Sequence, residues 1–429
     1  MTTPSEHPSQ TWQERLSLIV DTMRDMSRHT DPQEMVRAYG ERIGQLLPLD
    51  RRVSLSRRGL ADGQYRITRS TTWTEVVNPW QDKERLPLFT GGLLAKLIYG
   101  GEPQVFDNLE LDADEPAAEY LSGFKSLLAI PMYDQGESIN MVIMLQQAPG
   151  AFDKEQIPDL VWRTILFGRA TSNLVLKDEL ERTYQALDRE LKVVGNIQRA
   201  LLPAALPQIK TLDLAAVYQP ATRAGGDYYD FFPLPDGKWG IFIADVSGHG
   251  TPAAVLMAVT HCLAHTHPGS QVPPGKVLDY LNHQLTTLYT NRSETFVTAF
   301  YAIYDPQRRL LTYASAGHNP PRLKRCQDGS LLSLNRVGGL PLGIATVSPY
   351  QETEQQLQVG DQIIFYTDGI TEAHNPQGQL FGIERMDQVL ENCSVHAQSL
   401  LDAVLQSVEE FSNGRPADDD RTLIVARIT

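Results

Sequence analysis

Two stretches, IFIADVSGHG at residues 241–250 and IIFYTDGITEA at residues 363–373, carry the strongest information about the fold of this chain. In each, an apolar run typical of a buried strand ends in an aspartate, Asp245 or Asp368, with a glycine within the next three residues. Carboxylates that leave strand ends toward one cleft repel each other unless a cation neutralises them. The two stretches therefore predict a β-rich fold with a cation site at strand ends.

Two further aspartates extend this pattern. Asp227 lies in GGDYYD at residues 225–230, and Asp419 lies in ADDDRTLIV at residues 417–425, just before an apolar run. Oxygen ligands of this kind suit Mg²⁺ or Mn²⁺ rather than zinc. One Asp-Gly pair alone would be an ordinary turn, but four aspartates at strand ends favour a metal site.

Around these motifs, the chain beyond Pro203 alternates strand-like segments with turns rich in glycine and aspartate. Two helices, Pro252–Thr266 and Lys276–Thr290, are expected between the second and third of these strands. We predict a β-rich core flanked by helices. The expected strands are Leu212–Tyr218, Trp239–Ala244, Thr298–Asp305, Gln362–Tyr366 and Thr422–Arg427.

From about residue 190 to 429 the chain resembles the SpoIIE-type branch of the metal-dependent PPM serine/threonine phosphatases. The resemblance implies a β-sandwich of two antiparallel sheets flanked by helices, with a site for two Mn²⁺ or Mg²⁺ ions at one end. The matching stretches, in the order of the family, are IQRALLP (197–203), GGDYYD (225–230), DVSGHG (245–250), FVTAFYAIYDP (296–306), YASAGHNPP (313–321), LPLGI (340–344), YTDGITEA (366–373) and DDRTLIV (419–425).

The resemblance also implies a set of metal ligands. These are Asp227, Asp245, the backbone carbonyl of Val246, Asp368 and Asp419. Asp420 stands where relatives often carry asparagine, so we expect it behind the ligands. The implied reaction is hydrolysis of phosphoserine or phosphothreonine in a protein, with no protein nucleophile.

Three residues are candidates for contact with the substrate. Arg223 could bind a phosphate oxygen, or it could be an ordinary solvated arginine. His249, in SGHG, could transfer a proton or stabilise the turn. His318, in AGHNPP, could touch the substrate or shape a loop beside the site.

A histidine cluster admits two interpretations. His261 and His265 are four residues apart, a spacing that can bind a metal on a helix, and His267 follows closely. Histidines near the end of a helix are also favourable with the helix dipole. The sequence alone leaves both open.

Two alternative functions differ from a phosphatase. GGD also opens the signature of diguanylate cyclases, but Tyr228 and Tyr229 follow it here, and the other aspartate motifs have no place in that fold. The second alternative is a catalytically weak PPM-fold module that only binds partners. The presence of all four metal carboxylates disfavours it.

The amino-terminal part of the chain predicts an α+β domain. Amphipathic helices are expected around residues 16–26 and 35–47, and SLLAIPMYDQGESINMVIML at residues 126–145 predicts a hairpin. This part resembles a GAF domain. Residues 1–170 contain no cysteine and only two histidines, His7 and His29, which excludes covalent bilin and an iron–sulfur centre and disfavours haem. We expect a ligand-free sensor or dimerisation module.

Leucine and valine recur every seven residues at Leu180, Leu187, Val194 and Leu201. This heptad pattern predicts a parallel coiled-coil dimer, with a single amphipathic helix as the alternative. We therefore divide the chain into a GAF-like domain (1–170), a helical linker (171–203) and a phosphatase domain (204–429). Signals from the first domain would reach the third through the linker.

Composition limits the partners. The 429 residues carry a net charge of −14, which argues against nucleic acid as the main ligand. No apolar run is long enough to span a bilayer, and MTTPSEHPSQ lacks the features of a signal peptide, so we expect a cytoplasmic protein without membrane insertion. Three cysteines are too few for a disulfide framework. The family resemblance implies a phosphorylated STAS-domain anti-anti-sigma protein as substrate, within a partner-switching pathway.

Overall fold

The computed structural model forms two compact units, Met1–Tyr184 and Gln185–Thr429. The opening MTTPSEHPSQ, and Leu47 at the end of the second predicted helix, lie outside the described residues. The structure describes residues 11–46, 49–75, 77–267, 269, 272–291, 294–391, 393 and 396–429. In this part of the chain, no helix combines the length and the apolar character needed to cross a bilayer.

The amino-terminal unit is built on a six-stranded antiparallel sheet with the order β3-β2-β1-β6-β5-β4. The predicted hairpin is confirmed: β5 and β6 pair, and Gln135 and Gly136 between them both have positive φ, 51° and 87°. Such values are those of a tight two-residue hairpin turn. The strands are β1 (Arg51–Ser56), β2 (Gln64–Ser70), β3 (Leu88–Thr90), β4 (Gln104–Phe106), β5 (Ser126–Asp134) and β6 (Glu137–Gln146).

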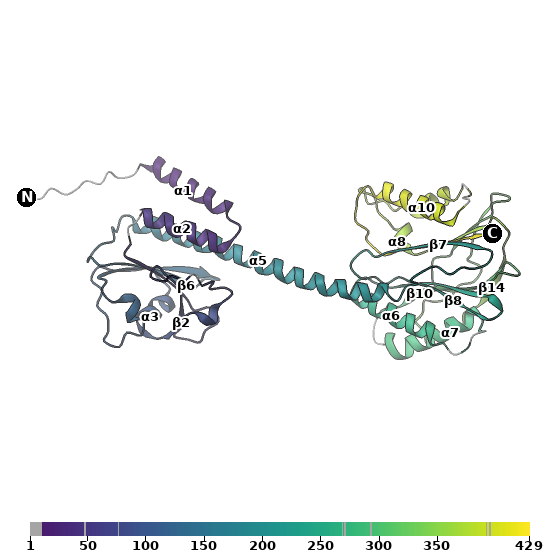
Figure 1. The fold of residues 1–429 in the computed structure, drawn as a ribbon, viewed down its shortest axis with the longest axis horizontal. Helices are drawn as coiled ribbons and strands as arrows, with labels where there is room; N and C mark the ends of the chain where they lie inside the picture. Colours follow the sequence, from purple (N-terminus) through teal and green to yellow (C-terminus); the bar gives the residue numbers. More distant parts are fainter. Residues whose placement is uncertain are drawn as a thin grey trace, which may run out of the picture. The chain divides into compact units, whose positions relative to one another are not determined.

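Helices cover both faces of this sheet, as Figure 1 shows. Successive side chains of a strand point to opposite faces, so the continuous apolar run of β5 serves two cores. Leu127 packs in the core that includes Leu94 of α3, whereas Leu128 packs with Ile43 of α2 and Leu160 of α5 (Ile157–Arg199). The helices are α1 (Trp12–Arg28), α2 (Pro32–Leu46), α3 (Gly92–Gly100), α4 (Ala118–Leu121) and the short η1 (Lys83–Arg85).

The long helix α5 (Ile157–Arg199) crosses from the first unit into the second. It contains most of the predicted linker (171–203) and begins before it, and the boundary between the units falls inside this helix. Leu180 and Leu187 of the heptad are exposed, 70% and 54%, whereas Val194 is half-buried. Just after α5 ends, Leu201 packs against the core of the carboxy-terminal unit. The exposed apolar stripe is therefore shorter than the heptad pattern.

The carboxy-terminal unit contains two five-stranded antiparallel sheets, β14-β11-β10-β9-β8 and β13-β12-β15-β16-β7. The α+β fold class and the β-sandwich flanked by helices are confirmed. The strands are β7 (Leu212–Gln219), β8 (Tyr228–Pro233), β9 (Trp239–Val246), β10 (Val297–Asp305), β11 (Leu310–Ala316), β12 (Arg322–Lys324), β13 (Leu331–Ser333), β14 (Glu352–Gln356), β15 (Gln362–Tyr366) and β16 (Arg421–Ile428).

Helices form the outer layers of this unit, with α6 and α7 on one side and α8 and α10 on the other (Figure 1). Met257 of α6 and Leu281 of α7 belong to the core that fills the space around the first sheet, and Val404 of α10 packs on the second sheet. The helices are η2 (Pro235–Gly237), α6 (Thr251–His265), α7 (Pro274–Leu285), the π-helical turn η3 (Thr286–Thr290), α8 (Asp368–Thr371), α9 (Gly382–Val389) and α10 (Ala397–Ser412).

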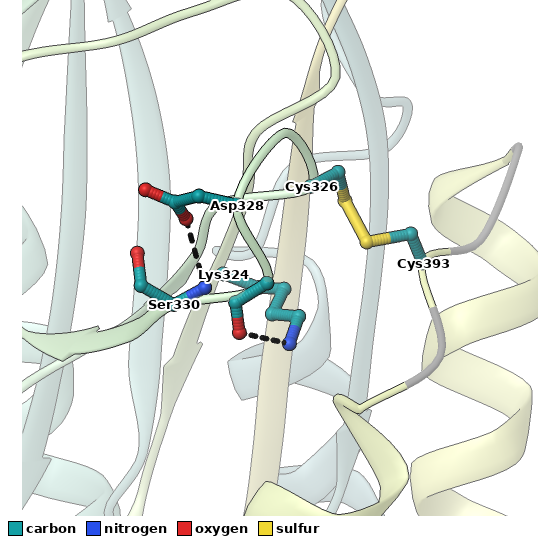
Figure 2. Close-up of a disulfide and its surroundings, with 6 residues drawn as sticks. Lys324, Cys326, Asp328, Ser330 and Cys393 are labelled. Atoms are coloured by element: carbon teal, nitrogen blue, oxygen red, sulfur yellow. Dashed lines mark hydrogen bonds between the residues drawn. A yellow bond between two sulfur atoms is a disulfide. The ribbon is translucent and has the colours of Figure 1, made fainter.

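Cys326 and Cys393 form a disulfide across 67 residues of sequence, and Cys262 is free and exposed. Figure 2 shows the bond beside a turn in which the Lys324 ammonium donates to the carbonyl of Gly329 at 2.7 Å. A single bond is no disulfide framework, but the pairing was not anticipated from the sequence.

Candidate active site

The four predicted metal aspartates come from both sheets of the carboxy-terminal unit. Asp227 directly precedes β8 and Asp245 lies near the end of β9, in the first sheet. Asp368 begins α8, two residues after β15, and Asp419 lies two residues before β16, in the second sheet.

Strand pairing explains why residues so far apart in the sequence meet. β8 pairs with β9 so that Tyr228 faces Ala244, which puts Asp227 beside Asp245. β15 pairs with β16 so that Tyr366 faces Leu423; the chain therefore leaves β15 and enters β16 at the same end of the second sheet.

Asp227 connects the two sheets through hydrogen bonds. Its Oδ2 accepts from the hydroxyl of Thr367 at 2.7 Å and from the hydroxyl of Thr422 at 2.6 Å. Thr367 follows β15 and Thr422 lies in β16, so both donors belong to the second sheet. The backbone N–H of Thr422 in turn donates to the hydroxyl of Thr367 at 2.9 Å. These threonines fix the Asp227 carboxylate in place.

The carboxylates are held close enough to raise each other's pKa. Burial and the neighbouring charge of Asp245 raise the pKa of Asp227 well above its ordinary value. Burial, then the charges of Asp368 and Asp419, raises the pKa of Asp245 to about 8. Burial and the charge of Asp419 raise the pKa of Asp368 to about 6. The structure thus brings all four predicted aspartates into one electrostatic cluster, in which protons or cations are favoured.

Asp420 is buried and holds the loop that carries Asp227. Its Oδ1 accepts from the backbone N–H of Ala221 at 2.8 Å, and its Oδ2 accepts from that of Gly226. A Cβ on Gly225 would lie 2.0 Å from Asp420 Oδ2, so glycine is required there. Both carboxylate oxygens of Asp420 therefore accept from backbone donors. Its position behind the metal ligands stays a prediction.

Val246 ends β9 beside the same loop. A Cβ on Gly226 would stand 2.8 Å from the carbonyl oxygen of Val246, so the GGD loop approaches this oxygen closely only because it carries glycine. The second glycine of the motif thus leaves the Val246 carbonyl unobstructed by a side chain from this loop.

The three predicted substrate residues lie in different surroundings. Arg223 donates from Nε to Asp188 of α5 at 2.8 Å, and His249 is exposed on the loop after β9. His318 is buried and its Nδ1 is hydrogen-bonded to the hydroxyl of Thr298 at 2.8 Å. Its burial favours the loop-shaping alternative, and the ion pair of Arg223 competes with phosphate binding. Substrate contact by these residues stays a prediction.

Sequence reasoning missed three residues that support the cluster: Thr367, Thr422 and Gln198. Gln198, in the last turn of α5, accepts from the N–H of Gly225 at 2.9 Å, and its amide group donates to the carbonyl of the same residue. The sequence marks only two of these three residues. The threonines flank Asp368 and Asp419 within the quoted motifs, whereas nothing local marks Gln198.

The carboxy-terminal unit, which carries this cluster of aspartates, is similar to known proteins. The sequence family described as Stage II sporulation protein E (SpoIIE) matches residues 235–429. Phosphoserine phosphatase RsbU of Bacillus subtilis is 32% identical over 243 residues, which cover 57% of this chain and 71% of RsbU. The chain belongs to the SpoIIE family of phosphatases.

Two further matches agree with this SpoIIE assignment. Phosphoserine phosphatase RsbP of Bacillus subtilis is 25% identical over 244 residues, 56% of this chain and 58% of RsbP. The solved structure of the SiaA-PP2C domain of Pseudomonas aeruginosa superposes with a TM-score of 0.50 at 23% identity, covering 58% of this chain and 99% of that domain. This last likeness shows the shared fold.

The SpoIIE-family assignment identifies an enzyme, a phosphatase of the metal-dependent PPM class. The matched range contains Asp245, Asp368 and Asp419 but begins after Asp227. It lies wholly in the carboxy-terminal unit, so the identity of the amino-terminal unit as a GAF domain is not part of the assignment.

Proposed function

We propose that this SpoIIE-family enzyme is a Mn²⁺- or Mg²⁺-dependent phosphatase of phosphoserine or phosphothreonine in a protein. The observation that carries the proposal is the cluster of four carboxylates contributed by two sheets. Burial and mutual repulsion raise the pKa of Asp245 to about 8 and that of Asp368 to about 6. Such a cluster is costly to keep charged without cations, and its hard oxygen donors fit Mg²⁺ and Mn²⁺.

The residues that would hold two divalent ions are Asp227, Asp245, the Val246 carbonyl, Asp368 and Asp419. Bound ions would supply Lewis acidity toward water and toward the phosphoryl group. The chain's own contribution is to orient these donors before substrate arrives. Thr367 and Thr422 hold Asp227, and Asp420 holds the glycine loop.

The relatives favour a phosphoserine protein as substrate. RsbU and RsbP both carry the name phosphoserine phosphatase, and RsbU is the more similar of the two to this chain. We propose a phosphorylated STAS-domain anti-anti-sigma protein, in a partner-switching pathway, as the physiological substrate.

We further propose that the amino-terminal unit is a GAF-like regulatory domain and that α5 transmits its state. Two contacts support this idea: Gln198 of α5 is hydrogen-bonded to Gly225, two residues before Asp227, and Asp188 of α5 pairs with Arg223. A change in the last turns of α5 would therefore act directly on the loop that carries Asp227. The exposed side chains of Leu180 and Leu187 support a homodimer through this helix.

The catalytic proposal is tested with the full chain, an aryl phosphate and a phosphorylated STAS-domain protein, with and without Mn²⁺. Asp368→Asn should lower Mn²⁺-dependent turnover by roughly 100-fold or more, because a ligand carboxylate is lost. Asp418→Asn is the matched control, since Asp418 is exposed and pairs with His374 and Arg415. Wild-type protein that binds Mn²⁺ by calorimetry yet hydrolyses neither substrate would favour the alternative, a partner-binding module.

A further inference from the structure

A second group of metal-ligating side chains lies between α6 and β8. Asp230, His261 and His265 each offer one ligand atom, and these atoms all lie within 4.8 Å of one another. Within the described residues, no other three histidines, cysteines, aspartates or glutamates come this close. No three carboxylates of the candidate active site are found this close together in the described part of the chain, and the two sites also differ in ligand type.

The fold explains how these three residues meet. His261 and His265 are one helical turn apart near the end of α6, so their rings lie on the same face, with centroids 4.3 Å apart. Asp230 lies in β8, and α6 packs so that His265 Nε2 is 2.7 Å from Asp230 Oδ2. His267 does not join them, because its ring packs edge-on against Tyr280 at 4.8 Å.

The carboxylate of Asp230 is already oriented by other donors. The hydroxyl of Tyr228 donates to Oδ2 at 2.7 Å, and the backbone N–H of Phe231 donates to Oδ1 at 2.7 Å. Asp230 is only 7% exposed, which limits its freedom further. Fixed carboxylates and supporting donors of this kind are typical of the surroundings of metal ligands.

His261 supplies an independent observation. Its Nδ1 is buried and has no hydrogen-bond partner in the part of the chain that the structure describes. A buried ring nitrogen without a hydrogen-bond partner is unfavourable unless another group satisfies it. A favourable interaction of the histidines with the helix dipole would leave His261 Nδ1 without a partner. A ligand bound by both imidazoles would explain why the two rings lie together.

We propose that Asp230, His261 and His265 form a transition-metal site, separate from the carboxylate site for Mn²⁺ or Mg²⁺. Two imidazoles and one carboxylate suit Zn²⁺ and related ions, with the remaining positions open to water. An ion here joins the end of α6 to β8. Because β8 begins directly after Asp227 and α6 begins five residues after Val246, the ion holds two elements that border the candidate active site.

The test uses full-length protein treated with chelator and then saturated with Mg²⁺, so that the carboxylate site does not compete for added Zn²⁺. All proteins carry Cys262→Ser, because Cys262 is exposed on the same helix and its thiol could bind Zn²⁺. Calorimetry should detect one equivalent of Zn²⁺. Co²⁺ serves as an optical probe and should give the visible bands of a site with imidazole ligands.

Three variants and one control decide the outcome. His261→Gln, His265→Gln and Asp230→Asn should each weaken Zn²⁺ binding at least about tenfold and change the Co²⁺ spectrum. His267→Gln, the control from the same segment, should bind as wild type. Absence of Zn²⁺ binding in excess Mg²⁺, or unchanged binding by His265→Gln, would overturn the proposal.

Asp230→Asn separates this site from an ordinary pair of surface histidines. If folded Asp230→Asn binds Zn²⁺ as tightly as wild type, the carboxylate is no ligand and the three-residue site is wrong. If this variant fails to fold, the Co²⁺ spectra of the two histidine variants decide, since the side chain of His265 is 45% exposed and its replacement removes little packing. Zn²⁺ should also raise the melting temperature of the wild type and not that of His265→Gln.

Discussion

Asp227 is the most enclosed of the four aspartates of the candidate active site, with 1% of its surface exposed. A carboxylate so buried is stable only if hydrogen bonds or cations compensate for lost water. The hydroxyls of Thr367 and Thr422 provide part of this compensation, and they also set the direction in which the second oxygen points. Two ordinary threonines thus determine the geometry of the site.

Thr422→Val removes one of these hydroxyls with almost no change in side-chain shape. We expect Mn²⁺ affinity and kcat/KM to fall by roughly 10- to 100-fold, because Asp227 loses an orienting donor. Calorimetry and turnover on an aryl phosphate measure both quantities. Thr312→Val, in the middle of β11, is the control. Mn²⁺ binding as tight as that of the wild type would show that the hydroxyl is dispensable.

His318 should make stability depend on pH. Burial lowers the pKa of His318 to about 4, and the backbone of Tyr366 opposes this shift only in part. Between pH 6.5 and 4 the unfolded chain therefore binds a proton that the folded chain does not, so stability falls as pH falls. Lowering the pH from 7 to 5 should cost the folded protein about 2 kcal/mol through this group.

The measurement compares urea unfolding of wild type and His318→Asn at the two pH values. The comparison is needed because Asp245 and Asp368, whose pKa values are raised, act in the opposite direction in both proteins. An equal pH dependence in wild type and variant would contradict the expectation. NMR titration of His318 provides the same information without a substitution.

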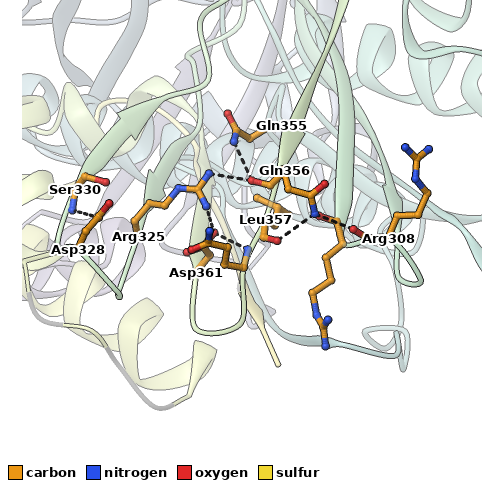
Figure 3. Close-up of polar contacts among 10 residues, drawn as sticks. Arg308, Arg325, Asp328, Ser330, Gln355, Gln356, Leu357 and Asp361 are labelled. Carbon is orange, nitrogen blue, oxygen red and sulfur yellow. Dashed lines mark hydrogen bonds and ion pairs between the residues drawn. The ribbon is translucent and has the colours of Figure 1, made fainter.

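At the scale of elements, a buried ion pair joins the two sheets away from the active site. Arg325, after β12, donates to Oδ2 of Asp361, before β15, at 2.9 Å, and also donates to the carbonyl of Gln356 at the end of β14 (Figure 3). The side chain of Asp361 is fully buried, and the N–H of Gln358 donates to it at 2.9 Å. The ion pair between Arg325 and Asp361 therefore holds in place the segment that connects β14, at the edge of the first sheet, to β15 in the second sheet.

Arg325→Met should destabilise the carboxy-terminal unit by about 3–5 kcal/mol, because it leaves the charge of Asp361 buried without a partner. Adding Asp361→Asn to this variant should restore part of the loss. Lys276→Met, which removes an exposed pair with Asp279, should change stability by about 1 kcal/mol or less. Hydrogen exchange in β15 and β16 reports the effect, and equal protection in Arg325→Met and Lys276→Met would refute it.

Long apolar elements were predictable, and short polar ones were not. β9, β10, β15 and β16 are strongly apolar, so their positions followed from the sequence within a few residues. β13 has only three residues, and β14 (ETEQQ) is polar and forms because it pairs with β11, which lies far back in the chain. Local patterns carry no information about such pairing.

The sequence predicts the aspartates of the candidate site but not the residues that support them. The aspartates stand out because each adjoins an apolar strand and a turn, but the contacts of Gln198 and the Cys326–Cys393 bond depend on tertiary proximity alone. The metal potential of His261 and His265 was visible as a helical spacing. Nothing in GGDYYD marks Asp230 as their third partner, because its contact with His265 depends on how α6 packs against β8.

At the scale of the whole molecule, α5 presents an apolar stripe that no described residue covers: Leu176, Leu180, Tyr184 and Leu187 are 54% to 70% exposed. Replacing Leu180 and Leu187 together by serine should weaken the proposed homodimer and change phosphatase activity, since both exposed side chains lie at heptad positions. Light scattering and turnover test this. Arg189→Ser, also exposed on α5, is the control. Unaltered oligomeric state and activity would refute the coiled-coil proposal.

Gln198, near the end of α5, contacts Gly225, whereas the exposed apolar stripe lies earlier in the same helix. The number of residues between them determines on which side of the helix the stripe lies relative to this contact. An α-helix turns about 100° per residue, so one residue inserted between Leu187 and Gln198 would rotate the apolar stripe by about 100° around the helix axis relative to Gln198. Seven inserted residues would return the stripe to within about 20° of its original side. We therefore expect that functional variants of this chain with a longer or shorter linker helix differ from it by multiples of seven residues. The stripe then keeps its direction around the helix axis relative to Gln198.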